Sequence, residues 1–426
     1  MKITFTVAGS RGDLQPYVAL GTRLRAEGAE VRIAAPAMFE DLVVGHGLKF
    51  SPIPLDPWGA ISRVLGGRST NLLAAGRASR KELSPIMDDL LHTYSKACEG
   101  ADAVVYSPVG FLGRAIAQDK GISSVGAACQ PFLNRTSSFP SAFLPVPGRQ
   151  VWAPGKARWR VYNRLTYTFS QQLLWSFIRA PANRALSGVD GSSPLPRLSH
   201  LKELNESGEL ILNGWSPRVL PHPPDWGDNL PITGYWTLPD GAGWTPPGDL
   251  VEFLECGPAP VVIGFGSIAG EDPQELRDLL VGALRRARRR GVVLTGWSGL
   301  SNAEFPEDVY SIPEAPHDWI FSKAEAVIHH GGAGTTGASL RSGNPTIVMP
   351  FYADQLFWAR RVAHLEAGVA TLPRAKMSAS RLAEAIEQAT NDWKIKVRAQ
   401  TLGRDLRSEN GVEVATKYIY QMLQNR

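Results

Sequence analysis

The sequence predicts an α/β protein made of two doubly wound domains that face one another across a cleft. Three observations indicate this class. The chain has 426 residues, more than one hydrophobic core usually serves. Both halves alternate apolar, strand-like runs with helical stretches, which is typical of parallel sheets covered on both faces. A region rich in proline and tryptophan separates the halves and ends in turn-forming residues, where we expect the interdomain linker.

The composition is that of an ordinary globular protein, with 43% hydrophobic and 20% charged residues, and it excludes a disordered chain. The first ten residues, MKITFTVAGS, suit a first strand better than a signal peptide. No apolar run approaches the roughly 18 residues that a membrane span needs. The three cysteines, Cys98, Cys129 and Cys256, are odd in number and widely spaced, which excludes a disulfide framework and favours a cytoplasmic location.

The first half begins with a predicted strand over residues 2–8 and an amphipathic helix over 14–28, with Pro16 in its first turn. Further strands are predicted over 30–35, 48–54, 103–107 and 122–128, and helices over 85–98 and 111–120. Ligands of such a sheet bind at the carboxyl ends of its strands. From about residue 131 to 249 proline and tryptophan become frequent, and only 158–178 has a helical pattern.

The second half restarts the alternation after the turn-rich stretch 241–249. Strands are predicted over 259–267, 291–297, 308–312, 324–330 and 346–351, helices over 273–290 and 356–368, and a helical region over 378–426. Several of these strands are followed by glycine-rich or polar loops, which a parallel sheet would bring together at one edge.

The stretch from Ala326 to Thr336, AVIHHGGAGTT, is the most informative of these corners. It predicts a strand, a glycine-rich loop and the start of a helix. The first-turn amides of a helix have no intrahelical acceptor and lie at the positive end of its dipole, and glycines let a ligand approach the backbone. The corner therefore predicts an anion site. Zinc is excluded for the adjacent histidines, because no third ligand follows at a useful spacing.

Four motifs follow one another in this half: PHDWIF (316–321), HHGGAGTT (329–336), GNPTIVMPF (343–351) and ADQ (353–355). Together they resemble the nucleotide-sugar site of GT-B glycosyltransferases, above all those that act on sterols, carotenoids and antibiotic aglycones. Residues 216–226 and 232–238 resemble the end of the acceptor domain in that family. The resemblance is strongest over 216–368 and 9–16.

The resemblance implies two Rossmann-like domains. We expect an acceptor-binding domain over 1–240, a linker over 241–258 and a nucleotide-sugar donor domain over 259–405. A helix over 406–426 would cross back to the first domain, as it does in the family.

For the donor, the resemblance places the diphosphate on a group of residues in the second domain, namely Ser267, His330, Gly332, Gly334 and Thr335. Ala315 and His317 would lie near the base and ribose, and His329 is expected to be structural. Glu314 stands where plant members carry a tryptophan that stacks on the base. Base stacking is therefore unassigned, and for Trp297, the candidate, core packing is an equally good interpretation.

Asp354 and Gln355 follow a predicted strand and precede a helix. A carboxylate and an amide offer acceptors and donors that match neighbouring sugar hydroxyls, and the family places this pair against the sugar ring. The alternative role for Asp354 is a helix N-cap. The two roles are compatible.

The first loop, GSRGDLQP (9–16), supplies the expected catalytic base. Plant members have Gly-His-x-x-Pro here, whereas this chain has Asp13 at the histidine position, as in the sterol and antibiotic relatives. A carboxylate in hydrogen-bond reach can take the proton of an attacking hydroxyl. The alternative is that Asp13 only caps a helix beginning at Leu14. Ser10 and Arg11 are expected to orient Asp13 or the acceptor.

The acceptor is expected to be a lipophilic molecule such as a sterol, terpenoid or polyketide. The stretch 131–175, rich in tryptophan and phenylalanine, could line an apolar pocket, although core packing is the simpler interpretation of any single aromatic residue there.

The net charge of +5 is partly concentrated in one cluster of arginines: Arg285, Arg286, Arg288, Arg289 and Arg290. A solvated helix face is the favoured interpretation. The alternative is weak peripheral attraction to anionic lipid. Nucleic acid is disfavoured as a partner, because the cluster lacks interleaved aromatic residues and no binding motif accompanies it.

The sequence thus predicts an inverting transferase that moves a hexose from a nucleotide diphosphate to a hydroxyl, with no metal and no cofactor beyond the nucleotide sugar. UDP-glucose is favoured as donor because Asp354 and Gln355 suit a fully hydroxylated ring, and a dTDP-deoxysugar is the alternative. A sugar-nucleotide epimerase would need further acid and base groups at the donor. A non-catalytic helper subunit is disfavoured by the presence of both Asp13 and the HHGGAGTT loop. The acceptor and the oligomeric state stay open.

Overall fold

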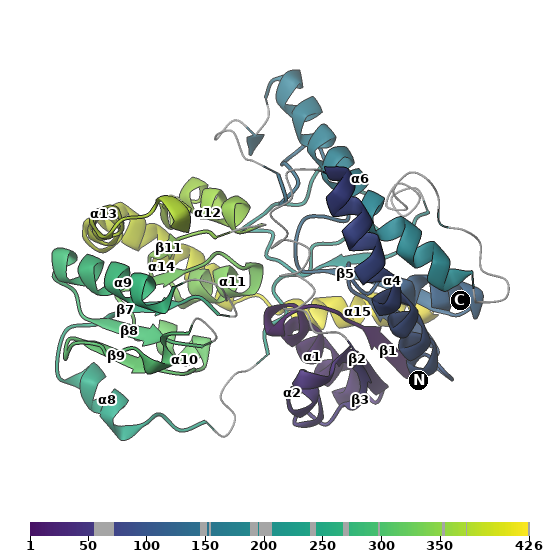
Figure 1. The fold of residues 1–426 in the computed structure, drawn as a ribbon, viewed down its shortest axis with the longest axis horizontal. Coiled ribbons are helices and arrows are strands. Elements are labelled where there is room, and N and C mark those ends of the chain that lie inside the picture. The colour runs from purple at the N-terminus through teal and green to yellow at the C-terminus, as the bar shows by residue number, and fades with distance from the viewer. Residues whose placement is uncertain are drawn as a thin grey trace.

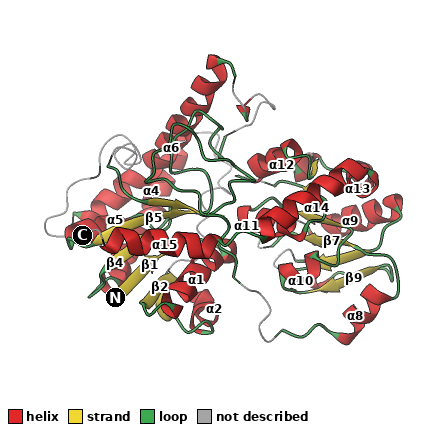
Figure 2. Cartoon of the chain, turned by 180° about the vertical axis from the view of Figure 1, so that it is seen from behind, coloured by secondary structure: helices red, strands yellow, loops and turns green. Residues whose placement is uncertain are grey.

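Two parallel six-stranded sheets, each with helices on both faces, make up the protein (Figure 1). The computed structural model describes residues 1–54, 72–144, 151–152, 155–187, 195, 207–238, 244–266, 272–296, 299–351, 354–371 and 373–424. The view from behind shows the two sheets side by side with separate sets of helices (Figure 2). The predicted fold class is confirmed.

The first sheet has the strand order β3-β2-β1-β4-β5-β6, and every pair is parallel. Its strands are β1 (Lys2–Thr6), β2 (Glu30–Pro36), β3 (Lys49–Ile53), β4 (Ala103–Tyr106), β5 (Ser123–Ala128) and β6 (Ile211–Asn213). All four residues of β4, AVVY, are buried, as expected of a strand covered on both faces. The sequence did not predict β6, which has only three residues and lies in the proline-rich region.

The second sheet has the order β12-β11-β10-β7-β8-β9, again parallel throughout. Its strands are β7 (Val261–Gly264), β8 (Gly291–Leu294), β9 (Val309–Ile312), β10 (Ala326–His329), β11 (Thr346–Val348) and β12 (Gly368–Ala370). Counted within each half, the two orders are the same. In each sheet the order in which successive strands are added reverses between the first and fourth strands of that half. Ligands of this fold bind at that point.

The helices of the first half are α1 (Arg11–Ala26), α2 (Glu40–Val44), α4 (Leu72–Ala97), α5 (Leu112–Asp119) and α6 (Ala157–Leu186). Two predicted helix starts were wrong by more than one residue, and the helix predicted over 158–178 continues to Leu186. The first helix starts at Arg11 rather than Leu14. The helix expected to start at Pro85 begins at Leu72, because the residues before the proline, LLAAGRASRKELS, are mostly good helix formers.

The helices of the second half are α8 (Gly248–Glu255), α9 (Pro273–Ala287), α10 (His317–Phe321), α11 (Ala333–Ser342), α12 (Gln355–His364), α13 (Ala379–Asn391) and α14 (Trp393–Arg407). Short 3₁₀ turns cover Ala37–Phe39, Leu300–Asn302 and Arg374–Lys376. Within the described residues, no helix is both long and apolar enough to cross a bilayer.

The last helix, α15 (Gly411–Gln424), leaves the second half and packs against α1 (Figure 1). The Tyr420 hydroxyl donates a hydrogen bond to the Leu24 carbonyl at 3.4 Å. Ala415 and Ile419 are buried in the apolar cluster that surrounds β1 and α1. The end of the chain therefore ties the two halves together.

A shared apolar core joins the halves at a second place. Trp152 of the first half lies 4.9 Å from Phe357 of α12, measured between ring centroids. The Arg361 guanidinium lies 5.2 Å from the centre of the Trp152 ring, and it donates to the Val219 carbonyl. Trp215 and Trp226 are buried in the same cluster. Of these tryptophans, Trp152 lies in the stretch 131–175 proposed as an acceptor wall, and its burial in this cluster favours the alternative of core packing.

Candidate active site

The carboxyl edges of the two sheets meet at the N-termini of α1 and α11, which pack against each other. Helix α1 follows β1, and α11 follows β10. A Cβ added to Gly334 would lie 3.9 Å from the Gly12 carbonyl oxygen. Beside this contact, Arg11 Nη1 lies 2.8 Å from Glu314 Oε2. Residues predicted from two separate motifs are therefore neighbours across the halves.

Asp13 occupies the third position of α1, so its predicted role as N-cap is wrong. Ser10 is the N-cap residue. The Asp13 Oδ2 atom accepts hydrogen bonds from the Ser10 backbone amide at 2.8 Å and from the Ser10 hydroxyl at 2.9 Å. Ser-x-x-Asp is a capping-box pattern, so the sequence carried a signal for this start. Gly9 has φ +137°, and a Cβ there would lie 2.5 Å from Asp13 Oδ2, so the carboxylate needs glycine at this position.

The environment of Asp13 makes its carboxylate a better proton acceptor. Burial raises the pKa of Asp13, and the two hydrogen bonds from Ser10 partly oppose that rise. Two further groups that no sequence motif indicated, Tyr17 and Cys129, lie close to Asp13. The Tyr17 hydroxyl donates to the Ala127 carbonyl at 2.7 Å. Burial, together with Cys129 and Asp13, raises the pKa of Tyr17 well above its usual value, so Tyr17 stays a neutral donor.

The donor side is the uncapped N-terminus of α11. Its N-cap residue is Gly332, which has no side chain to satisfy the first-turn amides. Gly334 is exposed and Thr335 half-buried, whereas the Thr336 hydroxyl is used within the helix, donating to the Gly332 carbonyl at 2.8 Å. An anion at this terminus would meet free backbone amides and the positive end of the helix dipole.

The His330 ring lies between two glycines at this corner. A Cβ on Gly332 would lie 2.5 Å from His330 Nε2, and one on Gly266 would lie 3.3 Å from its Cε1. Burial is the main cause that lowers the pKa of His330 to about 4, and the charge of His317 lowers it further. The ring is therefore neutral near pH 7 and can donate a hydrogen bond to an anion. His329 is buried, and its Nδ1 accepts from the Gly331 amide at 2.9 Å, a structural role as predicted.

The residues expected near the base lie beside the Arg11–Glu314 contact. Ala315 is buried. His317 begins α10 and stacks on Phe321 with ring centroids 4.6 Å apart. Burial, and then the positive charge of Arg11, lowers the pKa of His317 to about 4. Ser267 and Trp297 lie outside the described residues, a few positions after β7 and β8 respectively.

Asp354 and Gln355 lie at the start of α12. Asp354 is the N-cap residue but makes no side-chain cap bond. Instead its Oδ2 accepts from Trp358 Nε1 at 3.1 Å. Gln355 Oε1 accepts from the Phe351 amide at 2.8 Å. Burial, and then the negative charge of Asp13, raises the pKa of Asp354 to about 7. The charge of Asp13, in the first half, therefore contributes to the raised pKa of Asp354, in the second.

This arrangement offers two complementary chemical functions. The first half presents a half-buried carboxylate with a raised pKa, which suits removal of a proton from a hydroxyl. The second half presents a helix N-terminus and a neutral imidazole, which suit an anionic leaving group. Among the described residues, no group of three or more His, Cys, Asp or Glu side chains is placed to hold a metal ion.

Two protein families match parts of the chain. Residues 3–113 match the family described as glycosyltransferase family 28, N-terminal domain. Residues 292–420 match the family described as erythromycin biosynthesis protein CIII-like, C-terminal domain. The two matches fall on the two halves that meet at the site.

Among curated relatives, the sterol 3-beta-glucosyltransferase of Neurospora crassa is 36% identical over 440 residues, which cover 99% of this chain and 27% of the relative. That of Emericella nidulans is 36% identical over 436 residues, covering 100% of this chain and 30% of the relative. The chain thus spans less than a third of the length of these relatives.

Similar solved structures cover both chains almost fully. The glycosyltransferase of kitacinnamycin has a TM-score of 0.69 at 20% identity and covers 99% of this chain and 98% of that one. The calicheamicin glycosyltransferase CalG4 has a TM-score of 0.68 at 19% identity, with 100% and 98% covered. The glycosyltransferase VinC, solved in complex with dTDP, has a TM-score of 0.64 at 16% identity, with 100% of both chains covered.

Proposed function

Because this chain belongs to the GT-B glycosyltransferases, we propose that it transfers a hexose from a nucleotide sugar to a hydroxyl group of a lipophilic small molecule. One observation carries this proposal. The N-termini of α1 and α11 meet, so that a carboxylate suited to proton removal faces a terminus suited to a diphosphate. Neither half holds both groups.

In the proposed reaction the acceptor hydroxyl lies against Asp13. Its oxygen attacks the anomeric carbon of the donor sugar as its proton passes to the Asp13 carboxylate. The bond between the anomeric carbon and the diphosphate oxygen breaks, and the leaving diphosphate keeps the electron pair. The α11 amides, Thr335 and the neutral His330 ring stabilise the negative charge of the leaving group. Attack on the face opposite the leaving group inverts the configuration of the anomeric carbon.

Asp354 and Gln355 would bind the sugar ring. Gln355 is held by the Phe351 amide and Asp354 by Trp358, so each side chain has a fixed orientation. A sugar hydroxyl that donates to Asp354 would favour its ionised form. In this proposal no metal takes part, because α11 and His330 already supply donors for the diphosphate.

We favour UDP-glucose as the donor and a sterol-like molecule as the acceptor. The relatives with the higher identity are described as sterol 3-beta-glucosyltransferases, and Asp354 with Gln355 suits a ring that carries all its hydroxyls. A dTDP-deoxysugar is the second candidate, because structures with the same fold contain thymidine diphosphate.

The test is to incubate the purified chain with UDP-glucose or a set of dTDP-sugars and a panel of sterols, terpenoids and polyketides. Mass spectrometry would detect glycosides, and NMR would give the anomeric configuration. We expect a glucoside of inverted configuration, formed equally well with EDTA present. Tight UDP binding with no glycoside from any donor and acceptor pair would refute the proposal and favour a binding subunit.

A further inference from the structure

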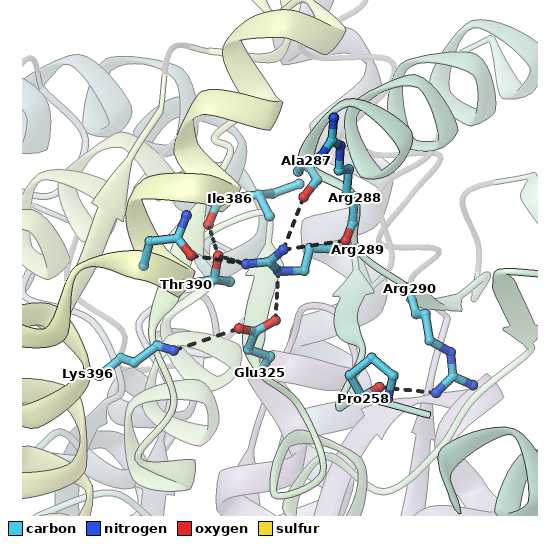
Figure 3. A network of polar contacts seen from close by, with 10 residues as sticks. Pro258, Ala287, Arg288, Arg289, Arg290, Glu325, Ile386, Thr390 and Lys396 are labelled. Atoms are coloured by element: carbon cyan, nitrogen blue, oxygen red, sulfur yellow. Dashed lines mark hydrogen bonds and ion pairs between the residues drawn. The ribbon is translucent and has the colours of Figure 1, made fainter. Parts of the chain in front are cut away.

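Two of the five arginines at the end of α9, Arg289 and Arg290, make contacts within the protein, whereas Arg285, Arg286 and Arg288 are exposed. Figure 3 shows the Arg289 guanidinium among internal partners. It bonds to Thr390 Oγ1 at 3.2 Å and to Asn391 Oδ1 at 3.1 Å, and pairs with Glu325 Oε2 at 2.9 Å. Arg290 donates to the Pro258 carbonyl at 3.1 Å and lies 4.0 Å from the centre of the Phe253 ring. These two side chains have a structural role.

Helix α6 carries a group of exposed apolar side chains in its first half. Thirteen large hydrophobic side chains are exposed among the described residues, and five of them lie between positions 161 and 174 of this helix. Val161, Leu165, Phe169 and Leu173 recur every four residues, and Phe169 is 61% exposed. Residues at this spacing share one face of a helix. The stripe is about 18 Å long at 1.5 Å per residue.

The buried face of α6 is polar where it covers the loop between β5 and the helix. The Asn163 amide donates to the Ser137 and Val151 carbonyls, each at 2.9 Å. Gln171 Nε2 donates to the Phe132 carbonyl at 2.7 Å, and the Ser141 amide donates to Thr166 Oγ1 at 2.9 Å. A helix of a water-soluble protein normally buries its apolar stripe. Here polar residues hold the loop beside the buried Tyr167 and Trp175, and the apolar side chains between 161 and 174 named above face outward.

The charge on α6 is of one sign. The helix has five arginines and no acidic residue. Arg158 and Arg160, with Lys156 just before the helix, are exposed at the N-terminal end of the apolar stripe. The Arg164 guanidinium lies 3.6 Å from Asp225 of a neighbouring loop, and Arg164 is itself more than half exposed. In Figures 1 and 2 α6 projects beyond the two sheets.

From this combination we propose that the outer face of α6 is a docking surface for an anionic phospholipid bilayer. Val161, Leu165 and Phe169 enter the boundary between headgroups and acyl chains, while Arg158 and Arg160 pair with lipid phosphates. An apolar stripe alone could equally cover a second copy of the chain. The absence of acidic residues on the helix decides for the bilayer, because two copies of this face would repel one another.

The test is co-sedimentation of the full chain with vesicles of phosphatidylcholine alone or mixed with phosphatidylglycerol. We expect binding to the mixed vesicles that weakens with added salt. The triple variant V161S/L165S/F169S should lower the partition coefficient at least about tenfold, since each buried methylene is worth close to a fourfold change. The double variant R158Q/R160Q should lose most of the preference for anionic vesicles.

Trp393→Ser with Val397→Ser is the matched control, because both side chains are exposed on α14 beside lysines. We expect this control to bind vesicles like the native chain. Unchanged thermal unfolding would show that each variant is folded. Absent vesicle binding, equal loss in the control, or a concentration-dependent dimer that only the triple variant abolishes would each overturn the proposal. The assay uses neither donor nor acceptor, so its failure would leave the transferase proposal standing.

Discussion

Replacing Asp354 by asparagine should change how the stability of the protein depends on pH. Burial and the charge of Asp13 raise the pKa of Asp354 from 3.8 to about 7. A group whose pKa is raised on folding stabilises the native state below its unfolded pKa, and that stabilisation is lost as the pH rises through the folded pKa. For Asp354 the window runs from about pH 4 to about pH 7.

Within this window each rise of one pH unit lowers the free energy of unfolding by about 1.4 kcal/mol. Between pH 5 and pH 8 the native chain should therefore lose about 2 to 3 kcal/mol of stability through Asp354. The variant has no titrating group at position 354, and the asparagine amide oxygen can still accept the hydrogen bond from Trp358 Nε1. His317 and His330, whose pKa values are lowered, lose stabilisation in the opposite direction as the pH falls, but they do so in both proteins and cancel in the difference.

The assay is urea unfolding of both proteins at several pH values in one buffer series. We expect the variant to gain about 2 to 3 kcal/mol relative to the native chain from pH 5 to pH 8, with no further change above pH 8. If the difference in unfolding free energy between the two proteins does not change over this range, the prediction is wrong. Asp354 would then be ionised throughout, and neither its burial nor the charge of Asp13 would raise its pKa.

Gly334→Ala should leave the fold intact, since the nearest atom to the new Cβ lies 3.9 Å away. If the diphosphate binds at the N-terminus of α11, the variant should bind UDP-glucose at least about tenfold more weakly. Native affinity measured by calorimetry would count against this site. Gly332→Ala places a Cβ 2.5 Å from the adjacent histidine ring and should weaken donor binding too. Glu314→Gln removes an ion pair that is 50% and 75% exposed, so urea unfolding should show a loss of less than about 1 kcal/mol. Ser10→Ala removes a hydrogen bond that lowers the pKa of Asp13, so the acidic limb of the kcat/KM profile should move to higher pH, and an unmoved limb would mean that Ser10 does not tune the base.

The parallel sheets were predictable because their strands are short apolar runs between helical patterns. The corner after β10 was equally visible, since glycines and histidines directly follow AVIH. Strands β6 and β12 were not predicted, because three residues carry no period that distinguishes a strand from a loop. The equally short β11 was predicted because it lies within the longer apolar run TIVMPF.

The boundary of α1 was missed although Ser10 and Asp13 have capping-box spacing, because the glycine at position 12 suggested a loop. The influence of Asp13 on Asp354 could not be predicted. It depends on how the two halves pack, through Trp152 and α12, and no local pattern encodes that contact. The outward apolar face of α6 was also hidden, since its period is that of any amphipathic helix and only the structure shows which face is buried.

In the proposed reaction one active site is divided between the halves, with Asp13 as its base. The turnover of Asp13→Asn with saturating UDP-glucose and acceptor, measured alongside its affinity for the donor, tests this most directly. Asparagine can still accept the two hydrogen bonds from Ser10, so the helix start should persist. We predict that kcat falls by about a hundredfold or more while the Kd for UDP-glucose changes less than about twofold. A variant that keeps most of its turnover would show that Asp13 is not the base and serves only in the capping box with Ser10.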